Sequence, residues 1–228
     1  MRIRCVDFET TGFPPDAAVV ESGWCDLEPG ANGIAWQIRI PTSQVCNPGR
    51  PIPPEASAVH HLTNEDVFGA PPWKEIVEAS GNGVDLLAAH RADFEAAFLP
   101  TWPKDKWICT WKVALRLWPE APSHKLQVLR YWAGLKVVKE LAEPPHRAAG
   151  DAYVTARLLK VLLANVTVEQ ALTISAEPAL LPRLTFGKHT MKPMAEVPAD
   201  YLEWMLGQKD MDKDARHTAM HELSRRRT

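Results

Sequence analysis

The stretch RIRCVDFETTG, residues 2–12, is an apolar segment that ends in two acids separated by one residue. The spacing predicts a strand over 2–8, and on a strand residues i and i+2 point to the same side. Asp7 and Glu9 therefore direct two carboxylates to one place. Paired anions repel unless a cation lies between them, and hard oxygen ligands suit magnesium. The motif predicts the beginning of a magnesium site.

The bulk composition limits the classes of protein that fit. With 228 residues, the chain has room for one large domain or for one domain plus a small second one. The net charge of −2 excludes a global basic field, so any contact with nucleic acid must come from a local patch. Four isolated cysteines predict neither a zinc site nor a disulfide framework, and favour a reducing, cytoplasmic location. We expect no signal peptide and no membrane span.

The order of the expected elements predicts an α/β fold with a mixed β-sheet flanked by helices. After 2–8, strands are expected over 18–27 and 34–40 as a hairpin whose turn contains Gly30 and Asn32-Gly33. Residues 47–54 are expected to be loop. The remaining expected strands are 85–89 and 107–109, and the expected helices are 55–60, 72–79, 92–99, 110–118, 125–133 and 147–164.

The last 51 residues differ in character from the rest of the chain. Pro178 and Pro182 mark a linker, and we expect a domain over 1–177 followed by a small appended module within 178–228. Lys188, His189 and Lys192 of the module are candidates for phosphate contact, with plain solvated charge as the equal alternative. The tryptophan cluster within 102–118 is interpreted as core in preference to a base-stacking surface.

Two later motifs supply further acids. HRAAGD, residues 146–151, places His146 at the mouth of the long helix and Asp151 in its first turns. AHRADFE, residues 89–95, offers Asp93 and Glu95, which lie about 200° apart on a helix and cannot share one face. One of these two acids is therefore expected at the site and the other in solvent.

The ordered set DFETTG, AHRADFE and HRAAGD resembles the three motifs of the DEDDh 3′→5′ exonuclease superfamily, which has an RNase H-like fold. Three further stretches strengthen the resemblance, and the last two of them are similar to the exonuclease X group: RPIPPEASAVHHLT (50–63), ICTWKVALRLWP (108–119), and FGKH with PADYLEWML in the C-terminal module.

One position departs from that family. Its second motif usually ends in aspartate, and alignment on His90 and Phe94 puts Glu95 at that position. The site either tolerates the longer side chain, which we favour, or has shifted its activity or metal preference.

The resemblance implies a metal-dependent exonuclease. Asp7, Glu9 and Asp151 would hold magnesium as a two-ion site, with manganese as a substitute, and Glu95 would support the second ion. His146 would be the general base. Thr10, Thr11, Gly12 and His60 would contact the substrate.

The implied substrate is a DNA 3′ end, single-stranded or duplex, cut to nucleoside 5′-monophosphates during DNA repair or end trimming. The alternatives are an RNA-trimming exonuclease and a non-catalytic module that binds DNA or a polymerase.

Overall fold

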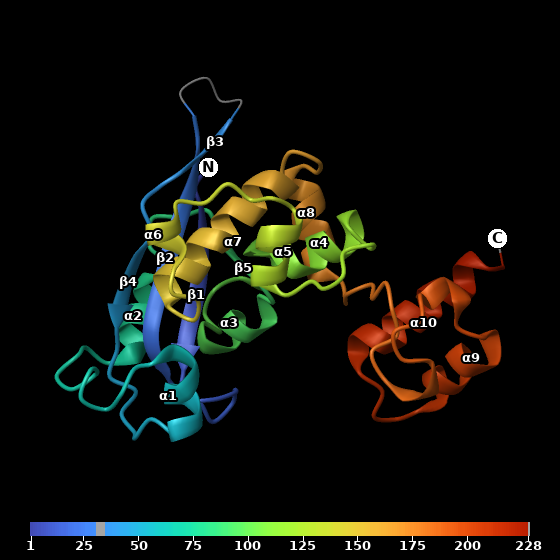
Figure 1. Cartoon of the computed structure of the whole chain (residues 1–228), viewed down its shortest axis with the longest axis horizontal. Coiled ribbons are helices and arrows are strands. Elements are labelled where there is room, and N and C mark those ends of the chain that lie inside the picture. The colour runs from blue at the N-terminus through green and yellow to red at the C-terminus, as the bar shows by residue number, and fades with distance from the viewer. Residues whose placement is uncertain (31–34, 228) are drawn as a thin grey trace.

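A computed structural model describes residues 1–30 and 35–227, and it contains one six-stranded mixed sheet (Figure 1). The strands are β1 (Ile3–Thr10), β2 (Val19–Pro29), β3 (Trp36–Ile38), β4 (Thr42–Val45), β5 (Leu86–Ala89) and β6 (Trp107–Cys109). Their order is β3-β2-β1-β5-β6, with β4 also paired to β2. The pairs of β2 with β1, β3 and β4 are antiparallel, whereas β5 pairs in parallel with β1 and β6. The mixed sheet predicted from the sequence is confirmed.

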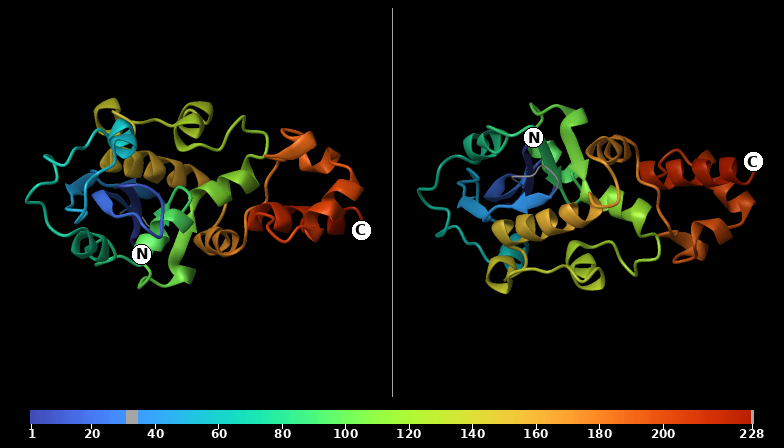
Figure 2. Two further views of the ribbon diagram at one scale, coloured as in Figure 1. Left: turned by 90° about the horizontal axis from the view of Figure 1, so that it is seen from below. Right: turned by 90° about the horizontal axis from the view of Figure 1, so that it is seen from above.

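Helices lie on both faces of this sheet (Figures 1 and 2). They are α1 (Pro54–His60), α2 (Trp73–Ala79), α3 (Asp93–Phe98), α4 (Thr110–Leu117), α5 (Leu126–Trp132), α6 (Lys139–Ala142), α7 (Ala148–Leu162), α8 (Val168–Ala176), α9 (Ala199–Gly207) and α10 (Lys213–Arg225). Three short 3₁₀ turns complete the set: η1 (Lys104–Lys106), η2 (Gly187–His189) and η3 (Met194–Glu196).

Strand β1 shows why both faces are covered. Its side chains alternate, so that Ile3 and Cys5 pack into one apolar cluster while Val6 and Phe8 pack into another. The first cluster receives buried side chains of α7 such as Ala152 and Leu159, and the second receives Phe98 of α3. Burial on both sides fixes the register of β1, and therefore the positions of its acidic residues.

Eight elements were not predicted from the sequence: β4, η1, α6 and α8, and, in the C-terminal module, η2, η3, α9 and α10. β4 reads Thr-Ser-Gln-Val and lacks an apolar alternation, so it forms because β2 offers a partner edge. α8 carried a usable signal, because Thr167 and Gln170 form a capping box at its start. The expected hairpin pairing of β2 with β3 is confirmed, whereas its predicted turn at Asn32-Gly33 lies outside the described residues.

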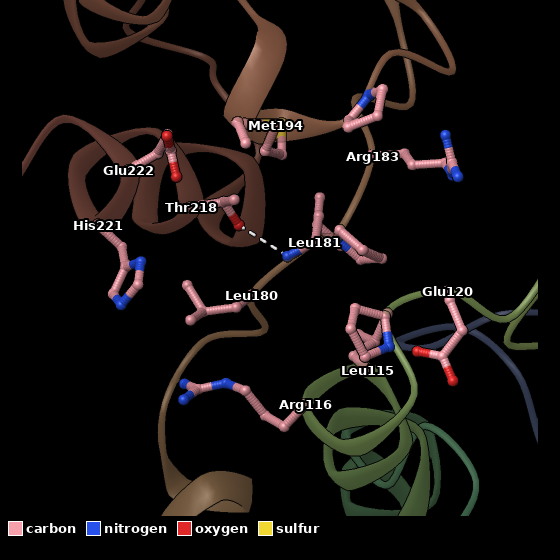
Figure 3. A pocket seen from close by; sticks show the side chains of 14 residues that line it. Leu115, Arg116, Glu120, Leu180, Leu181, Arg183, Met194, Thr218, His221 and Glu222 are labelled. Carbon is pink, nitrogen blue, oxygen red and sulfur yellow. Dashed lines mark hydrogen bonds between the residues drawn. The ribbon is translucent and has the colours of Figure 1, made fainter. Parts of the chain in front are cut away.

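The C-terminal residues form a helical unit at one end of the molecule (Figures 1 and 2). This unit has its own apolar cluster, which includes Leu184, Leu202, Met205, Ala219 and Leu223. A pocket of about 430 Å³ lies between it and the end of α4, and the hydroxyl of Thr218 accepts a hydrogen bond from the Leu181 amide at 3.0 Å there (Figure 3).

Within the described part of the chain, no helix has the length and apolar character required to cross a bilayer.

Candidate active site

Three carboxylates from distant parts of the chain meet at the carboxyl end of β1. Asp7 and Glu9 lie on β1, and Asp151 lies in the first turn of α7. Each offers one oxygen, and the three oxygens lie within 4.8 Å of one another. The fourth acid, Glu95, is buried in α3, and its negative charge acts on Asp7. The structure therefore brings together three of the four acids that the sequence motifs single out, and it buries the fourth, Glu95, in the nearby helix α3.

A close approach of helix to strand puts Asp151 in this group. A Cβ atom at Gly23 of β2 would overlap the backbone carbonyl of Ala148, the first residue of α7. Gly23 pairs directly with Asp7 across the sheet. Because Gly23 has no side chain, the start of α7 packs directly against the backbone of β2. Asp151, in the first turn of α7, is thereby brought to the acids of β1.

Hydrogen bonds hold both oxygens of Asp151. The amide of His146 donates to Oδ2 at 2.8 Å, and the side-chain amide of Gln127 donates to Oδ1 at 2.6 Å. Gln127 in turn accepts a bond from Arg130, a buried residue of α5. Sequence reasoning missed Gln127, because an isolated glutamine on a helix gives no signal of its partner.

Sequence reasoning also missed Glu21, which anchors the loop before α7. Glu21 is buried on β2 directly opposite Glu9. Its carboxylate accepts bonds from two guanidinium nitrogens of Arg147, both at 2.9 Å, from the Ala148 amide at 3.2 Å and from the Ser43 hydroxyl at 2.7 Å. Arg147 follows His146, so this ion pair fixes the backbone next to the candidate base.

The acids at the site repel one another. Burial, followed by the charges of Asp151, Glu9 and Glu95, raises the pKa of Asp7 well above its ordinary value. Burial and neighbouring carboxylates raise the pKa of Glu9 to about 7, and burial raises that of Glu95 to about 8. Glu21 behaves in the opposite way, because hydrogen bonds from Arg147 and Ser43 outweigh its burial and lower its pKa.

This donor set fits divalent cations that prefer oxygen ligands. Three carboxylate oxygens converge, and Oε2 of Glu95 is buried with no hydrogen-bond partner in residues 1–30 and 35–227. An unpartnered buried carboxylate oxygen is costly unless a cation or water meets it. The chemistry of the donors is that of magnesium or manganese sites.

The two acids of α3 have different surroundings. Glu95 is buried beside the β1 acids, whereas Asp93 is exposed and forms ion pairs with Lys112 at 3.7 Å and Lys213 at 2.5 Å. The second acid is exposed to solvent, as expected, and its ion pair with Lys213 also connects the helix of the site to the C-terminal unit. The separation of the two acids follows from their positions on the helix.

The other candidate residues differ in accessibility. His146 lies in an exposed segment before α7 with a φ of 61°. Thr10 donates to the Gly12 carbonyl at 2.6 Å, and the Thr11 hydroxyl accepts from the Ala18 amide at 3.0 Å, so both hydroxyls shape the turn after β1. His60 is buried, and its Nδ1 accepts from the Leu62 amide at 3.0 Å.

The fold and the convergent acids define a nuclease of the RNase H-like class, and comparison with known proteins gives its family. The model of the exonuclease family of the RNase T type matches residues 5–159. The chain belongs to this family, and it is a member of the DEDDh exonuclease superfamily.

Two relatives match most of the chain. It is 34% identical over 227 residues to Exodeoxyribonuclease 10 of Escherichia coli strain K12, covering 97% of this chain and 98% of that protein. It is also similar to the solved structure of Exonuclease X in complex with 5′ overhanging duplex DNA, with 33% identity, a TM-score of 0.64, and coverage of 76% of this chain and 99% of the other.

A more distant structure confirms the fold alone. The nuclease domain of 3′hExo, a DEDDh family member bound to rAMP, has a TM-score of 0.57 at 18% identity, with 74% of this chain and 94% of that chain covered. The chain is an enzyme of the 3′-exonuclease type, as its sequence motifs predicted.

Proposed function

We propose that this protein is a metal-dependent 3′→5′ exodeoxyribonuclease that removes nucleoside 5′-monophosphates from DNA 3′ ends. The observation that carries the proposal is the convergence of Asp7, Glu9 and Asp151 within 4.8 Å. Similarity along nearly the whole chain to a protein named as an exodeoxyribonuclease supports DNA as the substrate in preference to RNA.

Asp7, Glu9 and Asp151 would hold magnesium, with Glu95 close to them and manganese as a substitute. When bound, such cations lower the pKa of a coordinated water and offset the negative charge that develops on the phosphate. Four carboxylates in one place would otherwise repel the phosphodiester. The family resemblance implies two ions, whose four charges would balance the four carboxylates.

The chain supplies a proton acceptor, His146, on a loop before α7 that hydrogen bonds hold in place. In the proposed reaction, the oxygen of water forms a bond to phosphorus while the bond from phosphorus to the 3′-oxygen of the penultimate nucleotide breaks. The neutral ring of His146 accepts the proton lost by the water. Its backbone amide is held by Asp151, and the next residue, Arg147, is held by Glu21.

The turn after β1 would form the wall against the terminal nucleotide. Gly12 has a φ of 151°, which favours glycine, and among the described residues no atom beyond its chain neighbours lies within 4 Å of the place where its Cβ would be. That open space supports close approach by a sugar or base. Thr10 and Thr11 keep the turn in shape, and His60, which the family resemblance assigns to the substrate site, is buried.

We further propose that residues 1–177 are the nuclease domain and 178–228 a linker with a C-terminal module. The separate apolar cluster around Leu202 and Met205 supports this division. We also propose a role in DNA repair or end trimming in a reducing cytoplasm; the four buried cysteines, which are all free thiols, agree with the reducing compartment.

Release of mononucleotides from 5′-labelled oligonucleotides tests the proposal. With Mg²⁺, we expect a ladder of products shortened from the 3′ end, faster on DNA than on an RNA of the same sequence, and no products with a chelator. Faster RNA cleavage would overturn the substrate assignment. Absence of metal-dependent products on both would leave only a binding module.

A further inference from the structure

A partly exposed aromatic cluster lies on the C-terminal module, and the reaction at the active site does not use it. We call it the α9 surface and define it as Lys188, His189, Tyr201 and Trp204. The Tyr201 and Trp204 ring centroids are 5.0 Å apart with planes inclined by 35°, and the His189 ring meets Tyr201 edge-on at 4.7 Å. Lys188 Nζ lies 5.4 Å from the Tyr201 centroid.

The α9 surface depends on a glycine, Gly187, in the FGKH turn. Gly187 has a φ of 69°, and a Cβ there would overlap the Tyr201 hydroxyl. Glycine therefore lets the FGKH turn close onto the tyrosine. Along α9, Leu202 and Met205 are completely buried, whereas Trp204 is 49% exposed. The core of the module thus leaves much of this large aromatic side chain in solvent, where it is available to a ligand.

The charges near the α9 surface favour a polyanion. Residues 183–192 carry Arg183, Lys188, His189 and Lys192 and contain no acid. Asp200 and Glu203 on α9 limit the positive field, so phosphate attraction alone would be modest. Aromatic side chains that stack on bases, assisted by a few cations, are the usual means of binding single-stranded nucleic acid without sequence preference.

We propose that the α9 surface binds single-stranded DNA by stacking a base on Trp204 and Tyr201, with Lys188 and Lys192 at the phosphates. This inference rests on the proposed exodeoxyribonuclease function and adds a second contact to it. α9 lies on the side of the module away from the sheet (Figure 1), so only a strand much longer than the active site needs would reach both places. The contact would hold the substrate between successive cleavages.

The test compares two oligothymidylates, of about 6 and about 30 nucleotides, because stacking sites of this kind cover roughly 4–16 nucleotides. Affinity is measured by fluorescence anisotropy of the labelled oligonucleotide with a chelator present, and cleavage separately with Mg²⁺. We expect Trp204→Ala to weaken binding of the long strand about tenfold, and to leave cleavage of the short strand unchanged, because a short strand bound at the active site does not reach α9. Trp204→Phe, which keeps a stacking face, should stay close to wild type.

Trp132→Ala is the matched control. Trp132 is 40% exposed and also belongs to an aromatic pair, with Trp118 at 5.7 Å, but it has no place in the proposed surface. Its removal should leave long-strand affinity unchanged. Lys188→Ala should reduce the slope of log affinity against log salt by about 0.7, whereas Trp204→Ala should leave that slope unchanged.

The outcomes separate this inference from the function on which it rests. Long-strand affinity of Trp204→Ala within about twofold of wild type, with cleavage intact, would overturn the α9 surface alone; a loss of that size is only about 0.4 kcal/mol, below the value of one stacked base. An equal loss of cleavage on both strands, or an equal loss of long-strand affinity in Trp132→Ala, would also contradict it. Failure of the wild-type protein to cleave either strand would instead overturn the proposed function.

Discussion

Arg147 and Glu21 form a bidentate ion pair that joins the loop before α7 to β2, with both nitrogen–oxygen distances at 2.9 Å. Glu21 is buried, and its partner follows His146 directly in the chain. Planar two-point pairing fixes orientation as well as distance. The pair therefore fixes the position of the candidate base, His146, although neither Glu21 nor Arg147 belongs to the group of Asp7, Glu9 and Asp151.

Glu21→Gln should lower kcat by about 10- to 100-fold with little change in KM, because displacing a reacting group such as His146 by about 1 Å lowers the rate by up to about 100-fold. The amide cannot accept from both nitrogens of Arg147, so the loop with His146 loses its orientation. Steady-state kinetics on a short oligonucleotide measure the effect. The pH profile of kcat should also change, which simple loss of stability would not cause.

Glu28→Gln is the control for this prediction. Glu28 is on the same strand and pairs with Arg2 at 2.6 Å and with Arg39, but it lies at the other end of β2. We expect kcat to stay at the wild-type value. Equal losses of kcat in both variants would show that Glu21 acts only through the stability of the sheet.

His146→Ala should slow turnover by about 10²–10⁴-fold, the usual contribution of a general base. Because the residue is exposed, the free energy of unfolding should change little. Single-turnover cleavage and thermal denaturation measure the two quantities. His221→Ala, at another exposed histidine, serves as the control. A cleavage rate equal to wild type would mean that a different group accepts the proton.

Glu95 and Asp93 provide a test within one helix. Glu95→Ala should reduce cleavage by at least about 10²-fold, since it removes the acid that faces the β1 carboxylates. Asp93→Ala should leave the chemical step unchanged, because this acid pairs with lysines outside the site. Glu95→Asp should retain or raise activity. If Asp93→Ala were the damaging change, the alignment of the second motif would be wrong by two residues.

The pH dependence of stability follows from the raised pKa values of Glu9, about 7, and Glu95, about 8. A carboxyl group whose pKa is higher in the folded than in the unfolded state favours folding while it is protonated. That contribution is complete below the ordinary value of about 4.5 and is lost as the pH rises through 7 to 8. The metal-free protein should therefore melt a few degrees lower at about pH 8.5 than at about pH 6.

Magnesium should reverse this loss, because cations remove the repulsion among the acids. The increase in Tm on adding Mg²⁺ should be larger at the higher pH, where the carboxylates are ionised. Thermal denaturation with chelator or with Mg²⁺ at both pH values measures it. Glu95→Gln should flatten the pH dependence of the metal-free protein. A metal-free protein more stable at the higher pH would contradict the assignment of these shifts.

The sequence was sufficient to predict the acids and most strands and helices before residue 163, because both depend on local patterns. Alternation in β1 and the motif acids at 7, 9 and 151 can be recognised without coordinates. The partners Glu21 and Gln127 could not be recognised, because each acts through a contact with a residue 24 to 126 positions away, as the pairs 127–151 and 21–147 show. β4 was also missed because it depends on a distant contact: it forms by pairing with the edge that β2 offers.

Gly23→Ala tests the packing that brings the site together. The added Cβ would overlap the Ala148 carbonyl, which is backbone and cannot rotate away, so the start of α7 must move. We expect a loss of about 1–3 kcal/mol in the free energy of unfolding, as for other overpacked sites. Cleavage should fall further than stability alone explains, because Asp151 moves with the helix. Denaturant unfolding and cleavage kinetics measure the two effects.

Gly207→Ala is the matched control, because Gly207 is in helix α9 and, outside that helix's own backbone, no atom of the described part of the chain lies within 4 Å of the place where its Cβ would be. There alanine should be neutral or should stabilise the protein by up to about 1 kcal/mol, since it is the better helix former. The contrast isolates steric overlap from the general effect of replacing glycine. Wild-type activity in Gly23→Ala would mean that the contact between α7 and β2 does not position Asp151.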